Sequence, residues 1–248
     1  MDLRQIGPQG PLHLSFVAGV SKRLVVAFAC VGSKRHETPP EEFRRIAHGG
    51  GENNVLFVSD DSRSWVNGDG MADFLCETIT DVAQEIEAQS IAAIGNSMGG
   101  SAAMIVASKM PVDTVVAVMP QYSVHPEVIP QETRWTYFRK KISNWPFKVM
   151  PDLRDRDCKV AILHGGTPDE LWHAEMFPQD AGYDHFIFPE HGHRVARGLN
   201  KAGQLAPIVT QGILGRSVKL RQAARAAGGI SRAQFERRKG TFSEEALT

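Results

Sequence analysis

The stretch from residue 91 to residue 100 joins an apolar run to a glycine-rich turn: Ile91-Ala92-Ala93-Ile94-Gly95-Asn96-Ser97-Met98-Gly99-Gly100. Four consecutive apolar residues before a turn are typical of a strand that is buried on both faces. The segment from Ser101 to Met110, rich in alanine, predicts a helix with side chains small enough to pack closely on a sheet. The turn therefore has the pattern G-x-S-x-G in a strand-turn-helix context, which is typical of a nucleophilic serine.

Each position of this turn has a physical reason. Ser97 must lie on a sharp turn so that its hydroxyl projects above the sheet. Strand and helix backbones nearly touch there, so Gly95 and Gly99 carry no side chain that would collide. The backbone N–H of Met98 begins the helix, and the helix dipole helps it to stabilise an oxyanion.

The rest of the chain alternates apolar runs with helical patterns. The expected strands are Leu24–Ala29, Val55–Val58, Ile91–Ile94, Val112–Val118, Val160–Leu163 and His185–Phe188, and a helix is expected over Met71–Gln89. Alternating strands and helices imply right-handed crossovers and a doubly wound, mostly parallel α/β sheet. Ligands bind such sheets beyond the carboxyl ends of the strands, so the chemistry is expected there.

Two regions break the alternation. Residues 120–153 contain prolines, aromatic residues and the basic stretch Arg139-Lys140-Lys141, and we expect them to form a small cap over the sheet edge. Residues 1–215 would then be one domain, and residues 216–248 a basic, partly helical C-terminal tail. Such a tail suits solvent exposure or a contact in a homo-oligomer better than nucleic-acid binding.

Composition narrows the class of partner. The chain has 248 residues, with 28 basic and 28 acidic side chains, so net charge favours neither nucleic acid nor an anionic membrane as a partner. No apolar run approaches the roughly 20 residues of a membrane span, and the N-terminus has no signal-peptide pattern. Cys30, Cys76 and Cys158 have no paired spacing, which indicates free thiols in a reducing compartment. A cytoplasmic location is expected by default.

The turn around Ser97, together with Glu190-His191-Gly192-His193, resembles the α/β-hydrolase superfamily over roughly Leu12 to Leu214. Pro120-Gln121-Tyr122-Ser123 and Val128-Ile129-Pro130, leading to Arg134-Trp135, are similar to small hydrolase-like proteins associated with bacterial surface-polysaccharide synthesis. The resemblance implies a catalytic triad in the chain order serine, acid, histidine.

The resemblance places the general base after the last strand. A serine hydroxyl needs such a base within hydrogen-bond reach. The superfamily usually shows Gly-His at this point, which favours His193 over His191. The carboxylate that orients the imidazole is expected after the strand ending at Leu163, where we assign Asp169 and keep Glu170 as the reserve. Asp169 also suits the N-cap of the helix that follows.

The second oxyanion donor is expected after the strand ending at Ala29, as the backbone N–H of Cys30 or Val31. Together these residues predict a serine hydrolase that cleaves an ester of a small molecule or carbohydrate through an acyl-enzyme, without a cofactor or metal. Three alternatives stay open: an acyltransferase with the same triad, a non-catalytic binding protein of this fold, and a zinc site. The zinc site would use His164, His191, His193 and Asp169.

Overall fold

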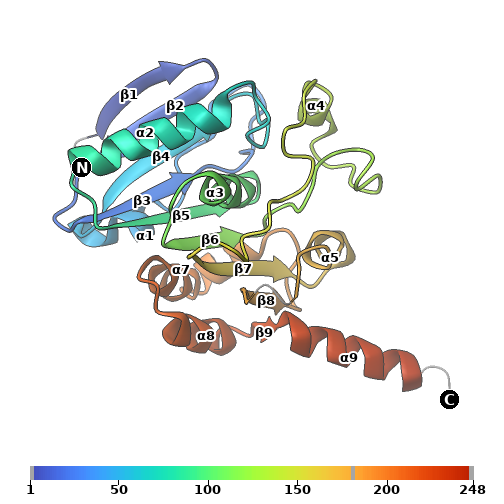
Figure 1. The fold of residues 1–248 in the computed structure, drawn as a ribbon. Helices are drawn as coiled ribbons and strands as arrows, with labels where there is room; N and C mark the ends of the chain where they lie inside the picture. Colours follow the sequence, from blue (N-terminus) through green and yellow to red (C-terminus); the bar gives the residue numbers. More distant parts are fainter. Residues whose placement is uncertain (1–2, 180–181, 246–248) are drawn as a thin grey trace.

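The computed structural model describes residues 3–179 and 182–245, and their strands form a nine-stranded sheet (Figure 1). The order across the sheet is β1-β2-β4-β3-β5-β6-β7-β8-β9. The strands are β1 (Leu3–Gln9), β2 (Leu12–Val17), β3 (Arg23–Phe28), β4 (Asn54–Asp60), β5 (Ser90–Asn96), β6 (Thr114–Val118), β7 (Lys159–Gly165), β8 (Asp184–Phe188) and β9 (Ile230–Ser231).

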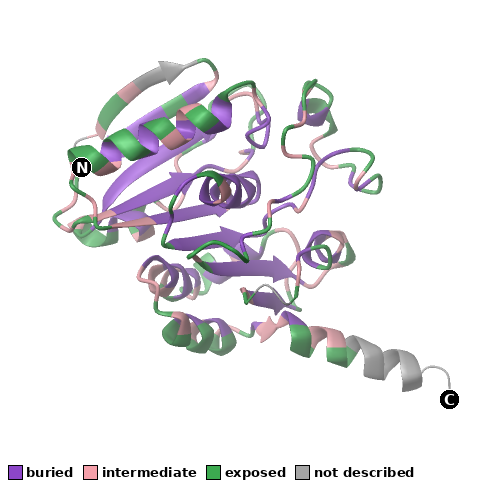
Figure 2. Cartoon of the chain, viewed as in Figure 1, coloured by how far each residue is buried: buried purple, intermediate pink, exposed green. Residues whose placement is uncertain are grey.

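The six central strands, β4-β3-β5-β6-β7-β8, are parallel. Strands β1, β2 and β9 pair antiparallel at the two edges. The central strands are almost wholly buried, which explains why their sequences are apolar at consecutive positions (Figure 2). The doubly wound α/β architecture predicted from the sequence is confirmed. The antiparallel edge strands were not predicted.

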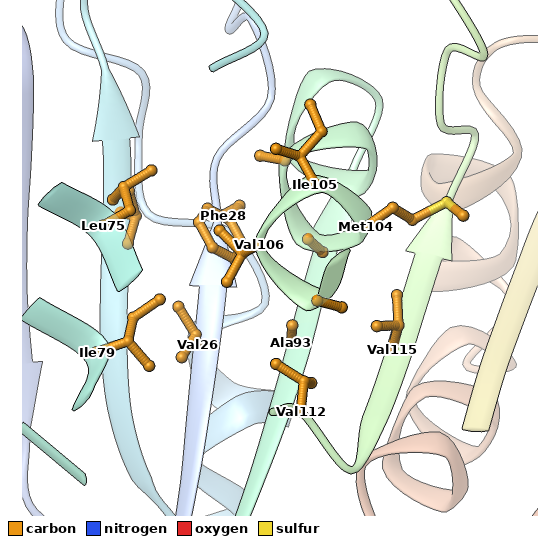
Figure 3. Packing of buried hydrophobic residues seen from close by; sticks show 14 of the residues in the cluster. Val26, Phe28, Leu75, Ile79, Ala93, Met104, Ile105, Val106, Val112 and Val115 are labelled. Atoms are coloured by element: carbon orange, nitrogen blue, oxygen red, sulfur yellow. The ribbon is translucent and has the colours of Figure 1, made fainter. Parts of the chain in front are cut away.

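Helices α2 (Met71–Glu85) and α3 (Met98–Lys109) cover one face of the sheet. Figure 3 shows Leu75 and Ile79 of α2 beside Val26 and Phe28 of β3. Helix α3 lies close against the strands beneath it, because most of its residues are small, and ten of them are buried.

The opposite face is covered by α1 (Arg44–His48), α6 (Val195–Lys201), α7 (Leu205–Ile213) and α8 (Ser217–Ala226), whose apolar residues share a second core with the same strands. A short 3-10 turn, Gly49–Gly51, follows α1. Helices α5 (Pro168–Ala174) and α9 (Arg232–Glu245) complete the fold. Among the described residues, no helix combines the length and apolar character needed to cross a membrane.

The expected cap and the expected tail differ in how they pack. Residues 120–153 leave the sheet after β6 and carry one short helix, α4 (Thr136–Arg139) (Figure 1). Beyond Gly215, Leu220 and Ala224 of α8 are buried in the core, and β9 extends the sheet by pairing with β8. This part of the C-terminal segment therefore contributes to the domain. The boundary at residue 215 stays a prediction.

Candidate active site

Ser97 lies at the turn between β5 and α3. Its backbone has φ 54° and ψ −121°, a conformation that non-glycine residues rarely adopt. The N–H of Ser97 donates to the carbonyl of Val118 (2.7 Å), which holds the turn on the neighbouring strand. A Cβ on Gly95 would overlap the carbonyl group of Gly99, and one on Gly99 would overlap the carbonyl oxygen of Phe28. The two glycines are needed because strand and helix backbones touch at the turn.

His193 reaches Ser97 from the loop between β8 and α6. The distance from Ser97 Oγ to His193 Nε2 is 3.3 Å, within hydrogen-bond reach for a nucleophile and its base. His191 points elsewhere, because its ring lies against Gly198 of α6. Of the two histidines that the sequence offered, the structure brings His193 to the serine.

The carboxylate that contacts the imidazole is Glu170, and the assignment of Asp169 was wrong on this point. His193 Nδ1 lies 2.7 Å from Glu170 Oε1, and the Glu170 side chain is 1% exposed. Asp169 is 40% exposed, and it accepts a hydrogen bond from Thr167 (2.7 Å) and contacts Arg134. Consecutive residues of a helix point about 100° apart, so only one of the two can face the histidine. Asp169 is also not the N-cap, which is Thr167.

Glu170 belongs to a chain of charged groups that extends into the cap and whose carboxylates are buried. Arg134 donates to Glu170 Oε1 (2.7 Å) and to both carboxylate oxygens of Glu132. Glu132 Oε2 also lies 3.0 Å from His173 Nε2. Burial opposes ionisation of Glu170, but His193, the nearby His164 and the hydrogen bond from Arg134 together outweigh it and lower its pKa to about 2. Burial likewise opposes ionisation of Glu132, yet His173 and Arg134 lower its pKa to about 2. Both carboxylates are therefore ionised at neutral pH.

The expected oxyanion donors are backbone N–H groups next to the turn at Ser97. Met98 is the first residue of α3, so its N–H has no acceptor within the helix. Cys30 is one of the two expected second donors, but its N–H and its thiol both face the carboxyl of Glu42. Burial raises the pKa of that carboxyl, and the two hydrogen bonds from Cys30 oppose the rise. Val31, the other expected donor, shares an apolar cluster with Met98, and its role as a donor stays a prediction.

The thiol of Cys30 is not poised to react. Burial and the nearby charge of Glu42 raise its pKa to about 12, so it is neutral at physiological pH. A neutral thiol is a weak nucleophile.

One polar side chain at the serine was not identified from the sequence. Gln121 is the third residue after the end of β6, and its Nε2 lies 3.1 Å from Ser97 Oγ. Its Oε1 accepts a hydrogen bond from Trp65 Nε1 (2.8 Å). The signal was its position, since Pro120-Gln121 lies at the carboxyl end of a central strand, where parallel sheets hold their functional residues.

Aromatic residues of the cap border His193. The rings of Trp135 and His193 are 5.2 Å apart, and Trp135 also meets Trp65 at 5.7 Å in an edge-on arrangement. The guanidinium of Arg134 lies 4.6 Å from the Trp135 ring. The cap therefore supplies an apolar wall beside His193.

The histidines proposed for a zinc site do not meet. His164 is buried within the sheet, where Nδ1 lies 2.9 Å from His185 and Nε2 lies 3.0 Å from the carbonyl of Pro120. His193 contacts Ser97 and Glu170 instead. Within residues 3–179 and 182–245, no group of three or more His, Cys, Asp or Glu side chains is arranged to hold a metal ion. The donor set for the zinc alternative is therefore not assembled.

The strand order, the turn at Ser97 and the histidine loop after β8 define an α/β-hydrolase fold. Solved structures with this fold align over most of the chain. A capsule O-acetyltransferase of Neisseria meningitidis serogroup A is similar with a TM-score of 0.57 and 10% identity, over 82% of this chain and 94% of that chain. The carboxylesterase CesB of Bacillus subtilis is similar with a TM-score of 0.54 and 14% identity, over 86% of this chain and 92% of that chain.

A third structure, the acylaminoacyl peptidase of Pyrococcus horikoshii, gives a TM-score of 0.62 at 11% identity, over 85% of this chain and 41% of that chain. At such identities the likeness establishes the fold. No protein-family profile and no curated protein sequence matches the chain. The activity must therefore be argued from the site itself.

Proposed function

We propose that this protein is a serine hydrolase that cleaves an ester through an acyl-enzyme on Ser97. The observation that carries the proposal is the line of contacts from Ser97 Oγ to His193 Nε2 (3.3 Å) and from His193 Nδ1 to Glu170 (2.7 Å). A nucleophile, a base and an orienting carboxylate in this geometry are the parts that acyl transfer requires.

In the proposed reaction, His193 Nε2 takes the hydroxyl proton while Ser97 Oγ attacks the ester carbonyl carbon. The oxyanion accepts hydrogen bonds from the N–H groups of Met98 and Val31. The tetrahedral intermediate collapses, the alcohol leaves with the proton from His193, and the acyl group remains on Ser97. Water, activated by the same histidine, then releases the acid. Glu170 holds the Nδ1–H tautomer and stabilises the imidazolium in both halves.

Acyl transfer to an alcohol is the second candidate, because the same acyl-enzyme can be resolved by a hydroxyl of an acceptor. The fold likeness to a capsule O-acetyltransferase favours this candidate and makes carbohydrate hydroxyls the first acceptors to test. The apolar wall at Trp135, beside His193, is of a kind that stacks on sugar rings. Acetylated sugars are therefore the first esters to test as well.

The test has two stages. A fluorophosphonate should label the parent chain and should not label the Ser97→Ala variant, since the reagent reports an activated serine. A panel of p-nitrophenyl esters and acetylated sugars, with and without a mono- or oligosaccharide acceptor, then separates hydrolysis from transfer by product analysis. A parent chain that resists the fluorophosphonate and turns over no ester would refute the proposal and favour a non-catalytic scaffold.

A further inference from the structure

The orientation of the Gln121 side chain is determined by its partners. Trp65 Nε1 can only donate a hydrogen bond, so the atom 2.8 Å from it must be the amide oxygen. The carbonyl of Met119 can only accept, so the atom 2.9 Å from it must be the amide nitrogen. The amide therefore cannot be turned over without leaving a buried donor facing a donor. Nε2 is the atom that faces Ser97.

This orientation decides how the Ser97 hydroxyl is used. An amide nitrogen has two N–H groups, one of which goes to Met119 and the other to Ser97 Oγ at 3.1 Å. Ser97 Oγ thus accepts one hydrogen bond and has a single hydrogen to donate. The neighbour that can receive this hydrogen is His193 Nε2, at 3.3 Å. The side-chain N–H of Gln121 thereby directs the hydroxyl proton of Ser97 toward His193 Nε2.

The surroundings make this hydrogen bond effective. Gln121 and Trp65 are each 1% exposed, so water does not compete for the amide. The backbone of Gln121 is held as well, because Ser101 Oγ accepts from its N–H (2.9 Å) and donates to its carbonyl (3.0 Å). The donor is therefore in place before any substrate arrives, and no reorganisation is needed during the reaction.

We propose that Gln121 is a catalytic residue that stabilises negative charge on Ser97 Oγ itself, in addition to the backbone groups that stabilise the carbonyl oxygen. Charge develops on Oγ twice: when the proton passes to His193 during attack, and when the bond from Oγ to the acyl carbon breaks during release of the acid. Trp65 is a positioning residue that prevents the amide from turning. This inference rests on the proposed function, because it assigns a role within that reaction.

The test compares rates of fluorophosphonate labelling, which report attack by Oγ without assuming a natural substrate. Gln121→Ala should label about 10- to 100-fold more slowly than the parent chain, the range expected for a hydrogen bond to a charged atom. Gln211→Ala makes the same change on α7, away from the site, and should label at the parental rate. Thermal unfolding of each variant shows that the labelled protein is folded.

The Gln121→Glu variant tests the pH dependence of labelling, which would not change if Gln121 had only a structural role. One carboxylate oxygen still accepts from Trp65, but the other faces the Met119 carbonyl and Ser97 Oγ and can donate only when protonated. The ratio of parental to variant labelling rate should therefore increase with pH. Trp65→Phe should cost about three- to tenfold, because the amide is then free to turn.

The outcomes separate the two proposals. A parent chain that is not labelled refutes the proposed function and this inference together. A labelled parent with Gln121→Ala within twofold of its rate, or with a Gln121→Glu ratio that does not change with pH, overturns the role of Gln121 and leaves the proposed function standing. If Gln121→Ala does not fold, the nearly isosteric Gln121→Glu and Trp65→Phe variants decide.

Discussion

Replacing Glu170 by glutamine removes the charge that faces the imidazole while keeping the shape of the side chain. Arg134 and the Nδ1–H of His193 both donate to the same oxygen, Oε1, so the introduced amide would turn its carbonyl oxygen toward them. The Nδ1–H tautomer is then retained. This differs from trypsin-type enzymes, in which the corresponding amide enforces the wrong tautomer and costs about 10⁴-fold.

The expected loss in Glu170→Gln is therefore electrostatic. Opposite charges whose centres are roughly 4 Å apart attract by about 4 kcal/mol at an effective dielectric constant of about 20. Part of this attraction is retained as a neutral hydrogen bond, so we expect kcat to fall by about 10²- to 10³-fold with little change in KM. The assay is steady-state ester hydrolysis, normalised to the folded fraction, because removing one partner of a buried ion pair also costs about 3–5 kcal/mol of stability.

The neighbouring residue provides the control. Asp169→Asn changes an exposed carboxylate whose contact with Arg134 is worth at most about 1 kcal/mol, so kcat should change by less than about fivefold. If Asp169→Asn lowers kcat as much as Glu170→Gln does, or if Glu170→Gln keeps parental activity, the reasoning from the hydrogen-bond geometry is refuted.

Three further predictions follow from the same contacts. Ser97→Ala should lower kcat by about 10⁴-fold or more and leave the thermal midpoint nearly unchanged; residual activity near the parental level would contradict the nucleophile. Gly95→Ala should destabilise the fold by about 3 kcal/mol or more in urea titration, because its Cβ would overlap backbone, whereas Gly50→Ala, which has φ +73° and open space, should cost about 1 kcal/mol. Equal losses of stability in Gly95→Ala and Gly50→Ala would show that the backbone around Ser97 shifts to make room for the added Cβ. Arg134 helps to hold the pKa of Glu170 at about 2, below its ordinary 4.5. The contribution of the ionised Glu170 to the free energy of unfolding is therefore complete above about pH 4.5 and is lost as the pH falls toward 2. Arg134→Gln should raise that pKa and move acid unfolding, followed by circular dichroism, to higher pH; an unchanged midpoint would argue against the ion pair.

The parts of the site that were predictable are those encoded by short-range patterns. Ser97 was identified because its glycines, its preceding strand and its following helix are adjacent in the chain. His193 required one further piece of information, its place after the last parallel strand, which the superfamily resemblance supplied. The alternation of apolar runs with helices likewise predicted the parallel centre of the sheet.

The parts that were not predictable depend on contacts between distant segments. Asp169 and Glu170 are adjacent, chemically similar and equally suited to orient a histidine. What separates them is the direction in which α5 turns each side chain and the position of Arg134, which lies 36 residues before Glu170 in the chain. Gln121 lies in a stretch that was quoted only for a resemblance, and its proposed role follows from where Trp65 and Met119 hold its amide. Edge strands β1 and β2 were missed because they lack the fully apolar character of the buried strands.

The ion pair between Arg134 and Glu170 joins the cap to the chemistry of the site. A cap attached in this way is unsuited to swing open as a lid, since movement of Arg134 would strip a buried carboxylate of its counter-charge at the moment when a substrate enters. Exchanging residues 120–153 for the cap of another protein would thus remove the contact of Arg134 with Glu170. Redesign of substrate preference in this fold would have to begin at the aromatic face of Trp135 and leave the adjoining arginine in place.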